Sequence, residues 1–419
     1  MTSFSNFDKS EPDTLKFDVA NCSSSFVNAI RRTIITDVET ISFNTEDYNN
    51  SDLQVIENTT SLHNEFILHR MGLIPIHSDN VATYNPDTYK FTLKKENKTQ
   101  NIIDVTTNDI QVLNLETNTL EDTEKFFPKN EITKDHILIV KLKPNPNGDG
   151  QKIHIEGKSS KGTGSSHIRF SPVSNVLFIN KQDPEKVDAG FSEYIKALQA
   201  ENNVSFSETE LKKLGRRFKI EKAERLFYTD DNNDPNVFEF EIESCGVLKP
   251  HRILIESLAA LESKLKNFIL ELEKELSGQP SSIKIKDSEC IMKSFDIVIE
   301  NENHTLGNLI QSYINKDYKS EDIFVGYMNP HPLKKEIFFR IKAENINSIK
   351  DIIVNTTSKL IETFNRLRNE VLKQFEGKIV FKPKKKKGKK TTESESESQV
   401  DAELSVKGPK TPTEVSVNN

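Results

Sequence analysis

Cysteine is scarce in this chain of 419 residues. Cys22, Cys245 and Cys290 lie far apart, and none has a second cysteine or a histidine at a ligand spacing, which disfavours zinc and a disulfide framework. Long apolar runs are missing too: none approaches the roughly 20 residues that span a membrane, and residues 1–10 lack the apolar core of a signal peptide. We therefore expect a soluble protein of a reducing compartment.

The chain also lacks a net positive charge. Its 57 Lys and Arg against 64 Asp and Glu give a net charge of -7, which is not the electrostatic character of a DNA-binding protein. A local exception is the lysine tract at residues 382–390, which precedes a Ser- and Glu-rich end. Because residues 382–419 cannot bury enough apolar surface, we expect them to be disordered. The tract could be a solvated tail, a localisation signal or a contact to phosphates.

Catalytic signatures are missing as well. The sequence has no Asp-x-Asp-x-Asp cluster for two magnesium ions, no Gly-rich phosphate loop and no defensible Ser/His/Asp set. His304 has no partner at a ligand spacing, so we interpret it as a turn residue, and the acidic residues Asp230, Asp231 and Asp234 as a solvated loop. We expect no catalytic residue, no cofactor and no metal.

Two long amphipathic helices are predicted by apolar residues that alternate at spacings of four and three. One stripe runs from Leu254 to Leu276, and the other from Ile353 to Phe375 along a helix of about 25 residues. The central positions are Leu258, Leu261, Leu265, Phe268 and Leu272 in the first, and Leu360, Phe364, Leu367 and Val371 in the second. Each helix has one face to bury, on a sheet as an ordinary core helix or against a similar long helix.

A boundary and an internal repeat follow from the pattern around these helices. Residues 277–282 combine helix terminators with linker residues. On both sides of them the order is a strand, a polar turn, a short helix, further strands and a long striped helix. Asn21 precedes Asn301 by 280 positions, and Ile30 precedes Ile310 by the same offset. This favours a degenerate repeat. The polar residues 202–236 read as an insertion or mobile loop with some helix.

The first short helix is expected from about residue 24 to 37, after serines that can cap it. Phe26, Val27, Ile30 and Ile34 share one face, and Asn28, Arg31 and Arg32 lie away from it. Both arginines are therefore expected to point outward. Taken alone, they would be read as a solvated basic face.

Two runs resemble the alpha-like subunits of RNA polymerase. Residues 26–34 (FVNAIRRTI) and 58–76 (NTTSLHNEFILHRMGLIPI) are similar to signatures of the archaeal D subunit and the third-largest subunit of eukaryotic RNA polymerase II. Residues 302–310 (ENHTLGNLI) and 325–333 (VGYMNPHPL) are similar to the archaeal L subunit and its small eukaryotic counterpart, the eleventh subunit.

The residues of the second pair of runs also have a physical interpretation. Thr305 is placed to cap a helix whose apolar face includes Leu306, Leu309 and Ile310, and Gly307 permits close backbone approach.

The resemblance implies an α+β fold with two alpha-like dimerisation modules, each a sheet with long helices, joined in one chain. Residues 1–44 and 171–276 would form the first module and 45–170 an inserted, mainly β domain. Residues 277–282 would be the linker, 283–381 the second module and 382–419 the tail. Some family members hold a zinc or iron–sulfur site in the inserted domain, but residues 44–167 contain no cysteine.

The resemblance also implies a function. Alpha-like subunits form a non-catalytic platform on which the largest and second-largest polymerase subunits and small accessory subunits dock, with DNA bound only indirectly and no membrane involved. The residues expected at the second-largest subunit are Asn28, Arg31, Arg32, His69, Arg70, Gly72 and Pro75. Such a fusion resembles that of large DNA viruses, which implies a viral factory in host cytoplasm, a virion or a nucleus. The alternative is a free nucleic-acid-binding factor that acts through the lysine tract.

Overall fold

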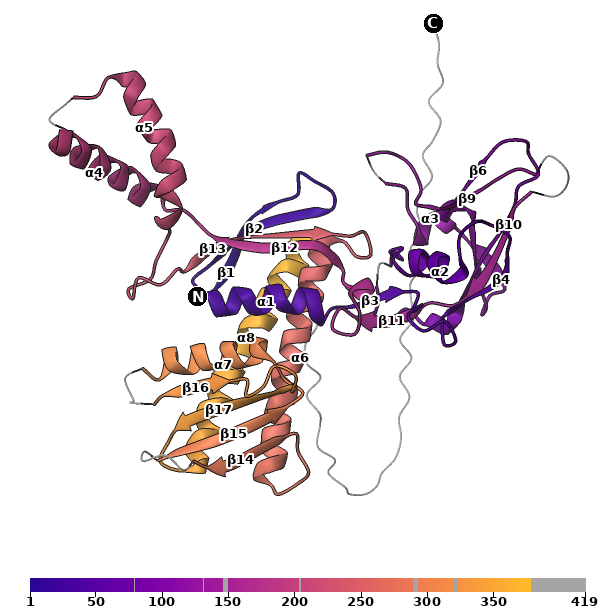
Figure 1. Cartoon of the computed structure of the whole chain (residues 1–419). Coiled ribbons are helices and arrows are strands. Elements are labelled where there is room, and N and C mark those ends of the chain that lie inside the picture. The colour runs from indigo at the N-terminus through magenta and orange to yellow at the C-terminus, as the bar shows by residue number, and fades with distance from the viewer. Residues whose placement is uncertain are drawn as a thin grey trace, which may run out of the picture. The chain divides into compact units, whose positions relative to one another are not determined.

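The computed structural model describes residues 1–78, 80–130, 132–145, 150–202, 205–288, 293–319 and 323–377 (Figure 1). The predicted tail at 382–419, with its lysine tract, and Cys290 lie outside these ranges. Within them, no helix is both long enough and apolar enough to cross a membrane. Helices and several antiparallel sheets alternate along the chain, so the predicted α+β class is confirmed.

The first sheet joins strands from both ends of the N-terminal half. Its strands, in spatial order, are β1 (Ser3–Asp8), β2 (Thr14–Ala20), β13 (Val237–Ser244) and β12 (Val173–Asn180). Alternate residues of β13 are buried, most of β2 is buried, and Phe17 pairs with Phe240 in register. The helices α1 (Ser24–Thr36) and α6 (Pro250–Leu276) contact this sheet and each other.

The second sheet belongs to the C-terminal half. Its spatial order is β14 (Ile283–Asp287), β15 (Ser294–Glu300), β17 (Glu336–Lys342) and β16 (Val325–Met328). The helices of this half are α7 (His304–Asp317) and α8 (Ile346–Glu376). The helix α8 is longer than the sequence predicted, because it begins at Ile346, where the Asn345 side chain caps it by accepting from the Ser348 N–H at 2.8 Å.

The predicted internal repeat has a counterpart in the backbone. Asn21 follows β2 and precedes α1 with φ +59°, and Asn301 follows β15 and precedes α7 with φ +62°. Asparagine tolerates this left-handed conformation better than other side chains do. The two halves thus enter their short helices through the same kind of turn.

The segment between β3 (Glu39–Ser42) and β12 is mainly β, as expected. It holds a sheet in the order β4 (Leu53–Asn58), β10 (Lys152–Gly157), β5 (Tyr89–Glu96), β7 (Ile110–Asn114) and β8 (Thr119–Glu121). Two further pairs are β3 (Glu39–Ser42) with β11 (Ser160–Thr163), and β6 (Ile103–Thr106) with β9 (Leu138–Leu142). The helices of this segment are α2 (Asn64–Gly72) and the short α3 (Thr123–Phe126). Phe43 and Phe91, both fully buried, meet edge to face at 5.1 Å in its core.

The polar region 202–236, expected to be an insertion or mobile loop with some helix, contains α5 (Glu208–Glu221). With α4 (Pro184–Asn202), which precedes the region, α5 forms a helical hairpin (Figure 1). A capping box between Ser207 and Glu210 starts α5. The buried Phe218 packs against Phe191 and Tyr194 at ring distances of 5.4 and 5.5 Å. Three aromatic side chains therefore give the hairpin a small core of its own.

Candidate subunit interface

The two long helices pack against each other across the boundary of the repeat. All the central positions predicted for α6 and α8 are at most 5% exposed. Between the helices, the Glu262 carboxylate of α6 lies 3.0 Å from the Arg368 guanidinium of α8 and 2.5 Å from Lys266. Because Glu262 is buried, its charge needs these partners. The striped helices therefore pack on each other, and α6 also contacts the first sheet.

The short helices add a second contact between the halves. Phe26 of α1 stacks on Phe364 of α8 with ring centroids 4.8 Å apart and an interplanar angle of 6°, and both side chains are fully buried. α1 also contacts α7, whose apolar residues Leu306, Leu309 and Ile310 are buried. Each half therefore contributes one long and one short helix to a shared core.

The two arginines of α1 make different contacts, which corrects the expectation that both point outward. Arg31 is half-buried and donates to the Asn28 side-chain oxygen at 3.1 and 3.0 Å. Arg32 instead donates from Nε to the Thr305 hydroxyl of α7 at 2.8 Å. A projection of the α1 sequence cannot reveal this contact, because the partner helix lies more than 270 residues further along the chain.

Two details at the start of α7 also differ from the prediction. The helix is capped by Asn303, whose side chain accepts from the Thr305 N–H at 2.9 Å, so Thr305 is not the cap. A Cβ atom at Gly307 would come within 2.5 Å of the Tyr327 ring. Glycine is thus needed for a close approach, but the approaching group is a side chain rather than backbone.

A charged cluster joins the end of α1, the middle of α6 and the turn before α7. The Lys264 ammonium lies 3.1 Å from Asp37 and 3.5 Å from Glu302. Burial raises the pKa of the Glu302 carboxyl above its usual value, although Lys264 acts in the opposite direction. This cluster is a further polar link between the halves.

The second group of predicted interface residues lies on α2 and just after it. His69 and Arg70 are exposed at the end of the helix, and Arg70 donates to the Leu138 carbonyl at 2.9 Å. Pro75 is half-buried. Gly72 is buried, and a Cβ there would collide with the Thr45 hydroxyl and the Arg169 guanidinium. Gly72 therefore positions this segment rather than forming its surface.

Two apolar residues, Phe66 in this helix and Leu73 at its C-cap, were missed by the sequence reasoning. Phe66 and Leu73 are 54% and 51% exposed. With His69 and Arg70 they occupy positions i, i+3, i+4 and i+7, which share one helix face. That spacing was available in the sequence. We call Phe66, His69, Arg70 and Leu73 the α2 face.

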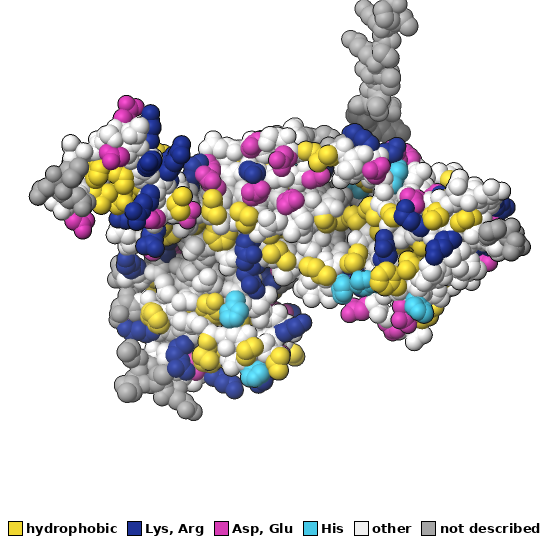
Figure 2. All heavy atoms as spheres, turned by 45° about the horizontal axis from the view of Figure 1, so that its top comes forward, with side chains coloured by type: hydrophobic (Ala, Val, Ile, Leu, Met, Phe, Trp, Pro, Cys, Tyr) yellow, Lys and Arg dark blue, Asp and Glu magenta, His cyan; other side chains and the backbone are white. Residues whose placement is uncertain are grey.

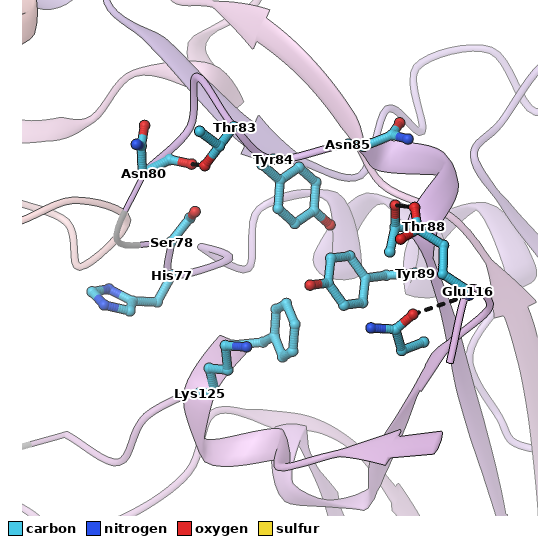
Figure 3. A pocket seen from close by; sticks show the side chains of 12 residues that line it. His77, Ser78, Asn80, Thr83, Tyr84, Asn85, Thr88, Tyr89, Glu116 and Lys125 are labelled. Carbon is cyan, nitrogen blue, oxygen red and sulfur yellow. Dashed lines mark hydrogen bonds between the residues drawn. The ribbon is translucent and has the colours of Figure 1, made fainter. Parts of the chain in front are cut away.

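A cavity of about 400 Å³ in the same segment contains none of the predicted interface residues. Figure 3 shows Tyr84 and Tyr89 side by side in its wall, with Lys125 below them. The two tyrosine rings are stacked at 5.3 Å, and the Tyr84 hydroxyl shares a 2.7 Å hydrogen bond with Ser159. Across the described ranges, no group of three or more His, Cys, Asp or Glu residues is arranged to hold a metal ion.

Comparison with known proteins places this helix arrangement in a family. The profile described as the RNA polymerase Rpb3/Rpb11 dimerisation domain matches residues 16–265, and a second profile with the same description matches residues 294–370. The conjugation stage-specific protein of Tetrahymena thermophila is 27% identical over 306 residues, which are 63% of this chain and 92% of that protein.

Several relatives have names that refer to RNA polymerase, including one from human and one from Aeropyrum pernix. Human DNA-directed RNA polymerases I and III subunit RPAC1 is 25% identical over 303 residues, 63% of this chain and 82% of that protein. Subunit Rpo3 of the Aeropyrum pernix DNA-directed RNA polymerase is 25% identical over 264 residues, 59% of this chain and 87% of that protein. Because the first profile match alone spans more than half of the sequence, this chain belongs to the Rpb3/Rpb11 family of RNA polymerase dimerisation-domain proteins.

Proposed function

We propose that this chain is a non-catalytic assembly subunit of a DNA-directed RNA polymerase, in which a D-like half and an L-like half are fused. The observation that carries the proposal is the pairing of α6 with α8 inside one chain, together with a dimerisation-domain match in each half. Relatives named as polymerase subunits align with 63% and 59% of this chain.

Fusion changes how such a pair assembles. A short linker turns the meeting of the halves into an intramolecular step, with an effective concentration on the order of millimolar. The linker is also held at both of its ends: Ser277 caps α6, and the Glu271 carboxylate accepts from the Ser282 N–H at 2.9 Å. Pairing then no longer depends on balanced synthesis of two polypeptides.

The docking surface in this proposal consists of Asn28 and Arg31 on α1 together with the α2 face. Asn28 and Arg31 form a bonded pair at the surface of α1, and a guanidinium can bind carboxylates or carbonyls in a bidentate manner. Phe66 and Leu73 supply exposed apolar area beside cationic Arg70. Aromatic residues, such as Phe66, and arginine are enriched in protein interfaces.

The partners in this proposal are the second-largest subunit at that surface, the largest subunit, and small accessory subunits. A fused D-like and L-like chain resembles those of large DNA viruses, so we place it in a cytoplasmic viral factory or virion, with the nucleus as the other site. Immunofluorescence of the host cell would separate these sites: staining confined to mitochondria or to the cell surface would contradict the proposal.

The docking surface can be tested with matched variants of the tagged full-length chain. One carries Arg31→Ala, His69→Ala and Arg70→Ala, and the control carries Lys98→Ala, Lys129→Ala and Lys334→Ala at exposed positions elsewhere. Arg32 is left intact because it holds the halves together. We expect the first variant to lose the second-largest subunit in affinity purification while the control retains it. Equal recovery by both would contradict the assigned surface.

The pairing of the halves can be tested separately by inserting a protease site between Gln279 and Pro280. After cleavage, the α6–α8 core should keep both fragments in one peak on size-exclusion chromatography, at the elution volume of the uncleaved protein. Fragments that separate under native conditions would show that the covalent linker alone holds the halves together.

A further inference from the structure

The α5 helix of the hairpin presents a basic face to solvent. Its cationic residues Lys212, Lys213, Arg216, Arg217 and Lys219 are all exposed. Projected at 100° per residue, Lys212, Lys213 and Arg216 lie on the side of the helix opposite Leu211, Leu214 and Phe218, which face the hairpin core. Arg217 and Lys219 flank that side. Figure 2 shows Lys and Arg side chains gathered on this hairpin beside a small apolar area.

The charge of this region contrasts with that of the chain. Residues 212–225 contain seven Lys or Arg and two Glu, a net charge of +5, whereas the whole chain carries -7. The acidic residues of the hairpin fall mainly elsewhere: α4 has four Asp or Glu and two Lys. Positive charge is therefore concentrated on the second part of α5 and on the turn that follows it.

Ion pairs within α5 neutralise only part of this positive charge. Lys212 lies 3.1 Å from Glu208, and Arg217 lies 2.8 Å from Glu221. Arg216 and Lys219 form no ion pair with any described residue, and the helix dipole favours a cation only in the last turn, where Lys219 lies.

The sequence also places like charges one helical turn apart. Lys212 precedes Arg216 by four residues, and Lys213 precedes Arg217 by four. Such pairs destabilise an isolated helix. A bound polyanion would relieve this repulsion.

We propose that this basic face binds the phosphate backbone of duplex nucleic acid without sequence preference. Lys212, Arg216 and Lys219 form a stripe about 10 Å long, parallel to the axis of α5, that can follow a row of phosphates. The face has no aromatic side chain on which an unpaired base could stack, which favours a duplex over a single strand. On α5, all of which is described, Ile220 is the single large apolar residue on this side, and that is too little for the centre of a protein interface.

This surface is distinct from the docking surface of the polymerase proposal. It lies on α5, whereas the assembly residues lie on α1 and α2. Binding of a duplex to the isolated chain does not depend on other subunits, so the two proposals can fail independently.

The test uses the full-length chain with the seven lysines of residues 382–390 changed to glutamine, so that the tract contributes no phosphate contacts. Into this background we would place Lys212→Gln, Arg216→Gln and Lys219→Gln, or the control changes Lys98→Gln, Lys129→Gln and Lys334→Gln, which remove the same charge. The readout is fluorescence anisotropy with a labelled random-sequence DNA duplex as salt is varied.

We expect the α5 variant to bind about tenfold or more weakly at low salt, and the slope of log affinity against log salt to fall by about 2.7, since each lost phosphate contact contributes about 0.9. The control should stay within about twofold of its parent. Lys212→Arg with Lys219→Arg should retain binding if circular dichroism shows unchanged helix content. Equal losses in the α5 variant and the control would overturn the proposal. So would binding of polyglutamate more tightly than the duplex at equal charge and equal salt, which would instead indicate an acidic protein partner.

Discussion

The Phe26–Phe364 stack offers a sharp test of how the halves are held together. Phe364 is fully buried, and its ring lies 4.8 Å from that of Phe26 in the other half. Truncating such a side chain removes its burial free energy and leaves a cavity, at a typical cost of about 3–5 kcal/mol. We therefore expect Phe364→Ala to lower the free energy of unfolding by that amount in urea, measured by far-ultraviolet circular dichroism.

Two companion variants separate this effect from a general loss of aromatic area. Phe364→Leu keeps most of the volume and should cost less, about 1.5 kcal/mol. Phe66→Ala removes a ring that is 54% exposed and should change the stability of the isolated chain by about 0.5 kcal/mol or less. The reasoning would be refuted if Phe364→Ala cost no more than Phe66→Ala.

Further predictions concern a glycine, a carboxyl group and a thiol. Gly72→Ala should cost about 1–3 kcal/mol because the new methyl group meets Thr45 and Arg169, whereas Gly215→Ala, which meets only Phe191 at 3.6 Å, should be neutral or stabilising in the same thermal melts. The folded-state pKa of Glu302 is raised by burial, so the folded state holds this proton more tightly and stability falls as pH rises from about 4.5 toward the folded pKa. Glu302→Gln should abolish that fall, and an unchanged pH profile would argue against a buried carboxyl. Burial raises the pKa of the Cys22 thiol to about 12. Iodoacetamide at pH 8 should therefore label Cys22 only as the protein unfolds, which mass spectrometry of the labelled peptides can follow. Labelling at the rate of a free thiol would refute this.

The long helices were predictable because the spacing of apolar residues along each one shows which face is buried. The stripe from Leu254 to Leu276 corresponds to α6, which is Pro250–Leu276, since the helix and its apolar face share the same residues. The start of α8 was missed because Ile346 and the residues that follow the Asn345 cap precede the stripe. Periodicity thus locates a buried face more reliably than it locates a helix end.

Contacts between distant segments were not predictable in the same way. The pairing of Arg32 with Thr305 and of Glu262 with Arg368 depends on how the halves pack together. The type of each residue does not show which distant residue it will contact. The α4–α5 hairpin was obscured for another reason: its core depends on only a few aromatic side chains within a polar, charged sequence. The α2 face could have been found, because Phe66 and Leu73 share a helical face with His69 and Arg70.

The most direct test of the central claim is affinity purification of the tagged wild-type chain from its native source, followed by mass spectrometry of the bound proteins. An assembly subunit with both alpha-like halves in one chain predicts that two very large polymerase subunits co-purify in stoichiometric amounts, and that no separate L-like subunit accompanies them. Recovery of the chain without any polymerase subunit would contradict the account.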